Sequence, residues 1–296
     1  MEDHTVFQWF PLQKKSTKWK FQKHNLSSNA HLSDPVVVLA STGGYRCGKS
    51  TLCALFSTLL SSANGGTIPT FEKWLERLRQ EKGKLKTLKG VSTFDPSGGS
   101  ESVTQGVSCV GYTIHDEDFE QNVCVVLADC QGLFDPMNSG DGIVPFGASM
   151  ILADEISYHC LKTISTTDLD ALACCAGLCD KEKEGRKRSK ESRGKTGGVA
   201  PPPDSNDLYC RVLVRDATTA MKPLSDRFDR RMTSADKYPI LKALQTSFPA
   251  GIRVAALPNP GECVASDSCE WWNASDEFLR CVYDQLRSSI RRVLNE

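Results

Sequence analysis

The stretch that decides the fold is Val36–Ser50, which reads VVVLASTGGYRCGKS. Its first five residues form a continuous β-branched and apolar run, which predicts a strand buried on both faces of a parallel sheet. A glycine-rich turn follows, and Lys49–Leu60 is predicted to be an apolar helix. The turn at Gly43–Ser50 fits the pattern G-x-x-x-x-G-K-S and stands between strand and helix, where a phosphate-binding loop belongs. The sequence therefore predicts a nucleotide-binding α/β domain.

The residue types of this loop suit the binding of phosphate groups. Glycines let successive backbone N–H groups wrap around phosphates, and the helix N-terminus adds a favourable partial charge. Lys49 is expected to reach the β- and γ-phosphates, and Ser50 is expected to ligate Mg²⁺. The residues of the loop predicted to bind the nucleotide are Gly43, Gly44, Tyr45, Arg46, Cys47, Gly48, Lys49, Ser50 and Thr51.

Two further motifs lie downstream of the loop. The predicted strand Val123–Ala128 is followed by D-C-Q-G, in which Asp129 is expected to hold Mg²⁺ and the N–H of Gly132 to face the γ-phosphate. Taken alone, such a segment is also an ordinary turn after a strand. Between the two motifs, T-Q-G-V at 104–107 lies in a predicted loop, where Thr104 is expected to contact Mg²⁺ and the γ-phosphate. The predicted metal ligands are Ser50, Thr104 and Asp129.

The base-reading motif N-K-x-D of small GTPases is absent from the sequence. Instead, the predicted strand Leu208–Val214 is followed by Arg215-Asp216. The carboxylate of Asp216 can accept hydrogen bonds from N1–H and the exocyclic amine of guanine, and adenine offers no such pair of donors on that edge. Arg215 and Asp216 are therefore predicted to select a guanine nucleotide.

The remaining segments predict alternating strands and helices around these motifs. Further strands are expected at Val107–Ile114 and in a hairpin of Thr5–Phe10 and Lys18–Phe21, and helices at Phe71–Gln80, Ala148–Leu161, Asp168–Cys179 and Asp276–Leu294. This alternation predicts one domain over residues 1–296, with a doubly wound, mainly parallel sheet and helices on both faces. Residues 181–203 are expected to form a disordered insertion that begins with the basic run 181–195. Within that run, residues 186–190 (RKRSK) are either part of a solvated loop or a nuclear-import or phosphate-binding patch.

Composition excludes several classes of protein. The chain has 36 Lys and Arg and 36 Asp and Glu, so its formal net charge is zero. Because there is no excess of basic residues, the composition does not predict nucleic-acid binding. It contains no apolar stretch of transmembrane length and no signal-peptide core, so a cytoplasmic protein is expected. The 13 cysteines include no C-x-x-C pair and are expected to be reduced, buried side chains. His159 is expected to be a partly exposed helix residue.

The order of these motifs resembles that of large GTPases of the atlastin and guanylate-binding-protein type, within the dynamin superfamily. The loop with its arginine, G-x-x-R-x-G-K-S, is similar to theirs. Further segments with this similarity are Gly98-Gly99-Ser100-Glu101, Thr104-Gln105-Gly106-Val107, Asp129–Asp135 (DCQGLFD), Leu213-Val214-Arg215-Asp216 and Leu257-Pro258-Asn259-Pro260-Gly261. The resemblance implies a P-loop NTPase fold that uses GTP, GDP and Mg²⁺.

The resemblance also implies how catalysis and assembly would work. Arg46 would act as an arginine finger supplied within the chain and positioned when two G domains meet in a homodimer. Gln131 would help to orient water. The catalytic residues so implied are Arg46, Lys49, Ser50, Thr104 and Gln131. The sequence stops after one helix and does not include the helical bundle and membrane hairpin of atlastins, which puts membrane fusion in doubt. Two interpretations stay open: a fragment of a longer protein, or a short member of the family.

Two other functions remain open at the level of sequence. The first is a nucleotide-gated interaction module that binds GTP or GDP and a partner with little turnover. The second is an ATP-using P-loop enzyme, against which Arg215-Asp216 argues.

Overall fold

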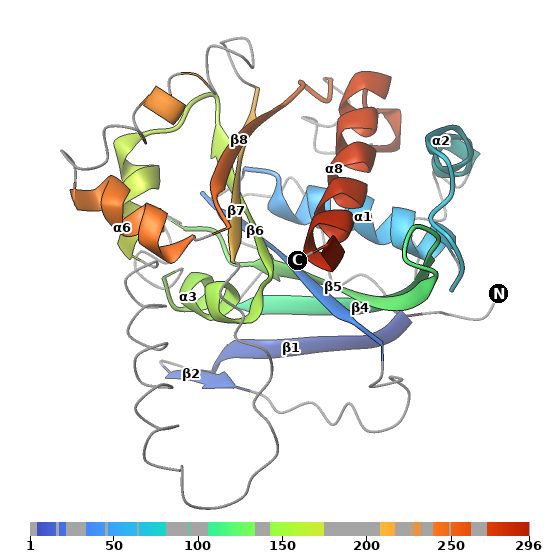
Figure 1. Cartoon of the computed structure of the whole chain (residues 1–296), viewed down its shortest axis with the longest axis horizontal. Helices are drawn as coiled ribbons and strands as arrows, with labels where there is room; N and C mark the ends of the chain where they lie inside the picture. The colour runs from blue at the N-terminus through green and yellow to red at the C-terminus, as the bar shows by residue number, and fades with distance from the viewer. Residues whose placement is uncertain are drawn as a thin grey trace, which may run out of the picture.

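Eight strands form one sheet in the order β2-β1-β4-β5-β3-β6-β7-β8 (Figure 1). The computed structural model describes residues 5–15, 18–21, 34–44, 47–63, 65–80, 94, 106–133, 143–174, 208–216, 226, 228–230, 232, 239–248, 250–261 and 271–295. The strands are β1 (Thr5–Lys15), β2 (Lys18–Phe21), β3 (Val36–Gly43), β4 (Val107–Asp116), β5 (Gln121–Cys130), β6 (Glu155–Leu161), β7 (Tyr209–Arg215) and β8 (Ile252–Leu257). The helices are α1 (Lys49–Ala63), α2 (Phe71–Gln80), α3 (Ile143–Leu152), α6 (Pro239–Ser247) and α8 (Asp276–Asn295), with a 3₁₀ turn at Trp271–Asn273 and helical residues at 166–174.

The pairing of the strands confirms the predicted mainly parallel α/β sheet. Strands β5, β3, β6, β7 and β8 run parallel, whereas β4, β1 and β2 extend the sheet antiparallel from β5. After β3, the chain forms β4 and β5 on one side of β3. It then crosses to the other side of β3, where it forms β6, β7 and β8. In such sheets, ligands bind beyond the carboxyl ends of the strands where the winding reverses. The expected ligand position is therefore the carboxyl end of β3.

Helices cover both faces of the sheet, as the sequence predicted. Alternate residues of β5 belong to two separate hydrophobic clusters, with Val125 in one and Val126 in the other. The cluster of Val125 includes side chains of α1, α2 and α8, and the cluster of Val126 includes those of α3 and α6. Figure 1 shows these two groups of helices on opposite sides of the sheet. The period-two side-chain alternation of strands produces the two cores.

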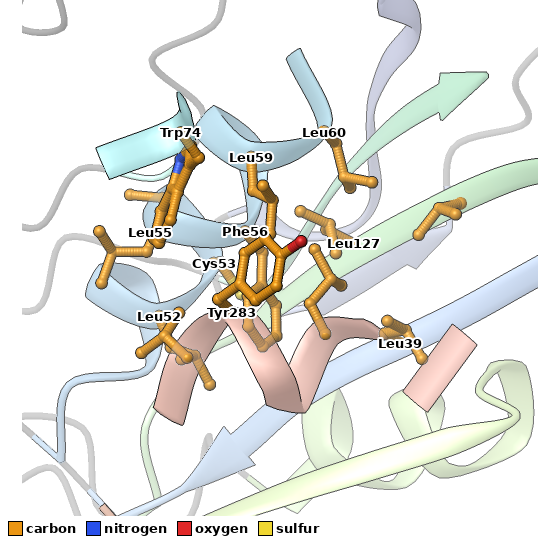
Figure 2. Close-up of a cluster of buried hydrophobic side chains, with 14 of the residues drawn as sticks. Leu39, Leu52, Cys53, Leu55, Phe56, Leu59, Leu60, Trp74, Leu127 and Tyr283 are labelled. Carbon is orange, nitrogen blue, oxygen red and sulfur yellow. The ribbon is translucent and has the colours of Figure 1, made fainter. Parts of the chain in front are cut away.

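Helix α1 is the centre of the larger core, because it is buried against the sheet on one side and against α2 and α8 on the other (Figure 2). Trp74 of α2 is fully buried and its indole N–H donates to Thr58 Oγ1 over 3.3 Å. Tyr283 of α8 lies against Phe71, with ring centroids 5.7 Å apart, and donates its hydroxyl hydrogen to the carbonyl of Pro69. These contacts hold the helix that follows the phosphate-binding loop.

The predicted helix Ala148–Leu161 is wrong in its second half. Helix α3 ends at Leu152, and Glu155–Leu161 is β6, a central strand between β3 and β7. The buried apolar residues Ile156, Tyr158 and Cys160 alternate with polar residues at period two, which is typical of a strand. His159 is accordingly a buried strand residue, and the expectation of a partly exposed helix residue is also wrong.

The structure also contains elements that the sequence did not predict. Helix α6 and the edge strand β8 follow each other at 239–257, and β8 pairs parallel with β7. The helix expected at Asp168–Cys179 is described only over 166–174. The segment 181–203 lies outside the described residues. Within the described part, the nine cysteines are free thiols, and no helix is both long and apolar enough to cross a bilayer.

Candidate nucleotide-binding site

The predicted site residues that the structure describes lie at one edge of the sheet, where β3, β5, β6 and β7 end. The glycine-rich loop leaves β3 at Gly43, and Asp129 is next to the end of β5, paired with Ser41 of β3. Arg215 ends β7 and pairs with Leu161 at the end of β6. This common edge is the position that the reversal of winding indicates for a ligand. Tyr45, Arg46 and Thr104 lie outside the described residues.

Two positions of the loop need glycine. Gly43 has φ +124°, and a Cβ atom there would lie 2.4 Å from the backbone oxygen of His159 on β6. Gly48 has φ +83°, and a Cβ atom there would lie 2.7 Å from the guanidinium of Arg215. Positive φ values of this kind are strained for residues with a side chain. The glycines thus allow the loop to approach β6 and Arg215 closely.

Lys49 is a buried cation inside the loop. Its Nζ donates to the carbonyl of Gly44 over 2.7 Å, so the amine lies next to the start of the loop. Burial lowers the pKa of Lys49, and the charge of Asp129 partly offsets that effect. A buried amine with a carbonyl partner can still donate two further hydrogen bonds. An anion held by the loop would accept these two hydrogen bonds. Its negative charge would stabilise the protonated amine of Lys49 and so raise the pKa of Lys49 again.

Ser50 and Asp129 lie together beside Lys49. The hydroxyl of Ser50, in the first turn of α1, donates to Oδ2 of the buried Asp129 over 2.7 Å. Hydroxyl and carboxylate oxygens are suitable ligands for a hard cation such as Mg²⁺. The described residues contain no group of three or more His, Cys, Asp and Glu placed to hold a metal. A Mg²⁺ ion here would therefore need further ligands from phosphate and water, which is its usual mode of binding beside nucleotides.

Backbone hydrogen bonds join the three predicted phosphate motifs. The N–H of Leu133, which follows D-C-Q-G, donates to the carbonyl of Gly43 over 2.9 Å. The N–H of Gln131 donates to the carbonyl of Gly106, and the N–H of Gly106 donates to Oε1 of Gln131 over 3.1 Å. Gln131 is buried, and its side-chain oxygen holds the end of the T-Q-G segment. The assignment of Gln131 to water orientation therefore stays a prediction.

Arg215 and Asp216 bring the predicted base-reading motif to the loop. Nε of Arg215 lies 3.3 Å from Oδ2 of Asp216, and both side chains are about three quarters buried. Among the described residues, Oδ1 of Asp216 is buried and has no hydrogen-bond partner. Since a buried carboxylate oxygen is costly without a donor, this atom can accept a hydrogen bond from a ligand.

Two polar residues next to the loop, Ser41 and His159, were not predicted as residues of the site. His159 Nε2 is 2.7 Å from the hydroxyl of Ser41, and both side chains are buried. Burial, with smaller effects of the Lys49 and Arg215 charges, lowers the pKa of His159 to about 3. The period-two pattern of Glu155–Leu161 was the signal that could have placed His159 in a strand, but it does not specify that this strand lies beside β3.

Comparisons with known proteins give one family. A search of curated protein sequences finds no significant match. The family described as guanylate-binding protein, N-terminal domain, matches residues 17–220, which are more than half of the chain. The matched region contains the glycine-rich loop, Asp129–Gly132 and Arg215-Asp216, and it confirms the resemblance drawn from the motifs. The chain therefore belongs to the guanylate-binding protein family of large GTPases.

Proposed function

We propose that this domain binds GTP with Mg²⁺ and hydrolyses it to GDP and phosphate. The observation that carries this proposal is the joining of three phosphate motifs, through Leu133 to Gly43 and through Gln131 to Gly106, around the buried Lys49. Membership in the guanylate-binding protein family supports guanine nucleotides as the ligands.

In this proposal, each polar residue of the site has a separate task. The loop amides and Lys49 hold the β- and γ-phosphates, and Thr51 adds its amide from the first turn of α1. Ser50, Asp129 and Thr104 would hold Mg²⁺, which would neutralise charge on the β- and γ-phosphates. The N–H of Gly132 faces the γ-phosphate while water attacks in line. This assignment leaves the stabilisation of the developing negative charge to Lys49 and Arg46.

The concentration dependence of turnover tests this function and its main alternative. If Arg46 acts when two G domains meet, then GTP hydrolysis per molecule should rise with protein concentration. Arg46→Ala should lower the maximal rate roughly 1,000-fold or more, as expected for an arginine finger. GDP affinity should change much less, because the variant keeps the backbone amide of the loop. Phosphate release at a series of protein concentrations measures the turnover rate. Light scattering in GDP and a fluoride transition-state mimic measures whether two domains associate. GTP binding without hydrolysis at any concentration would favour the interaction module instead.

Asp216 is expected to determine the choice of base. Asp216→Asn replaces a carboxylate that can accept from both guanine donors with an amide that accepts at one atom and donates at the other. GTP affinity should fall about 100-fold, the size expected for lost charge-assisted hydrogen bonds. Xanthosine triphosphate, which has an oxygen in place of the exocyclic amine, should bind the variant better than GTP does. Competition of a fluorescent guanine nucleotide by GTP, xanthosine triphosphate and ATP measures this order.

The same titrations separate GTP from ATP as the natural substrate. Displacement of the labelled guanine nucleotide from the unmodified protein by equimolar ATP would contradict guanine selection. Unchanged GTP affinity in Asp216→Asn would remove Asp216 from the base site, without removing the phosphate loop.

A further inference from the structure

Strand β6 lies directly beside the first residues of the phosphate-binding loop. Gly43 and His159 are register partners in the β3–β6 pair, and the N–H of Gly44 donates to the carbonyl of His159 over 3.2 Å. The two backbones are so close that a Cβ atom at Gly43 would lie 2.4 Å from that carbonyl oxygen. The first two residues of the loop thus contact the backbone of His159 directly.

The imidazole of His159 contacts both ends of the loop. Its Nε2 is 2.7 Å from the hydroxyl of Ser41, two residues before Gly43, and the ring makes a hydrogen bond to the backbone of Cys47, just before Gly48. The ring and the Ser41 hydroxyl are buried. A single rigid side chain therefore connects the segment before the loop to the segment that enters α1.

The environment of the ring fixes the direction of these bonds. Burial lowers the pKa of His159 to about 3, so the ring is neutral at ordinary pH and has one N–H donor and one acceptor nitrogen. The hydrogen bond to the Cys47 backbone opposes that lowering, as expected when the ring donates to it. The other nitrogen then accepts from the Ser41 hydroxyl. The neutral ring can satisfy both partners without placing a second charge beside Lys49.

We propose that His159 is a positioning residue that holds the loop backbone in its phosphate-binding conformation. This inference rests on the proposed nucleotide binding at the loop. Phosphate binding depends on the directions of the loop N–H groups, and glycines alone leave these directions poorly restrained. Loss of the ring should therefore weaken contacts to the β-phosphate and leave contacts to the base unchanged.

The experiment compares GDP with GMP, which lacks the β-phosphate. In His159→Leu, which keeps an apolar side chain of similar size, GDP affinity should fall about tenfold, the effect of one lost hydrogen bond. GMP affinity should change less than twofold. His159→Gln, which retains a donor and an acceptor, should recover part of the GDP affinity. Competition titrations give both affinities, and thermal unfolding without nucleotide reports the stability of each variant.

A matched control comes from the neighbouring residue of the same strand. The side chain of Tyr158 is buried on the face of the sheet opposite to that of His159, and its hydroxyl donates to Asp168 over 3.1 Å. Tyr158→Phe also removes a hydrogen bond of a buried β6 side chain, and it should leave the ratio of GDP to GMP affinity unchanged.

The outcomes separate this inference from the proposed function. Unchanged GDP affinity in His159→Leu would overturn the positioning role, and so would equal losses of GDP and GMP affinity, because a general loss of structure predicts equal losses. Failure of the unmodified protein to bind either nucleotide would instead contradict the proposed function.

Discussion

Lys49→Ala should abolish measurable binding of GTP and GDP. The amine of Lys49 is buried within the loop, where it donates to the carbonyl of Gly44 and has capacity for phosphate oxygens. Charge-assisted hydrogen bonds to phosphate are among the strongest polar contacts, so their loss should lower affinity at least about 100-fold. Titration of a fluorescent guanine nucleotide, with and without Mg²⁺, measures the change.

The stability of the nucleotide-free protein distinguishes this effect from unfolding. Because burial disfavours the charged amine, as the lowered pKa shows, Lys49→Ala should not lower the unfolding temperature of the free protein greatly. It should remove the increase in that temperature which GDP causes in the unmodified protein. Lys73 lies exposed on α2, and Lys73→Ala is a control that should keep the GDP-dependent increase. A Lys49→Ala protein that still binds GDP normally would contradict the phosphate-loop assignment.

Local pattern was enough to predict the elements whose burial follows a simple period. The predicted helix Phe71–Gln80 has the bounds of α2, because Phe71, Trp74 and Leu78 repeat at helical spacing and all three are buried. The apolar run from Val36 likewise became the central strand β3, which is hydrogen-bonded to neighbours on both sides. In these segments local preference and tertiary packing agree.

The prediction was wrong where sheet order decides the structure. The segment 148–161 is apolar enough for a buried helix, but Glu155–Leu161 completes the sheet between β3 and β7. Edge strand β8 was missed because it is a short run, IRVAAL, in which two of the six residues are alanines, which are depleted in strands. Strand neighbours far apart in sequence are set by tertiary pairing, and short apolar runs fit both helix and strand.

Within the site, too, local motifs predicted some residues, whereas others depend on which strands lie side by side. Gly43, Lys49, Ser50, Asp129 and Asp216 could be placed at one edge from motif order, because the carboxyl ends of parallel strands share an edge. The contact of His159 with Ser41 depends on β6 lying beside β3, which local sequence does not specify. The roles of Tyr45, Arg46 and Thr104 stay predictions, because these residues lie outside the described part of the chain.

Glu155, at the start of β6, is the carboxylate that joins helix α8 to the sheet. It is 1% exposed and accepts a hydrogen bond from Ser289 over 2.8 Å. It also forms ion pairs with Arg292 of α8 at 3.0 Å and with Arg211 of β7 at 3.2 Å. Arg292 lies over the ring of Tyr209, with its guanidinium carbon 3.9 Å from the centroid. The carboxylate thus balances two arginines whose side chains are only 19% and 12% exposed.

Glu155→Ala should destabilise the fold by about 3–5 kcal/mol, because it removes a buried carboxylate that pairs with two largely buried guanidinium groups at once. Asp118→Ala is the matched control: Asp118 pairs with Arg291 of α8, and both side chains are about half exposed. That surface pair should contribute less than about 1 kcal/mol. Urea unfolding followed by circular dichroism measures both free energies of unfolding. Equal losses in the two variants would show that burial does not determine the contribution of Glu155, and that apolar packing alone holds α8 on the sheet.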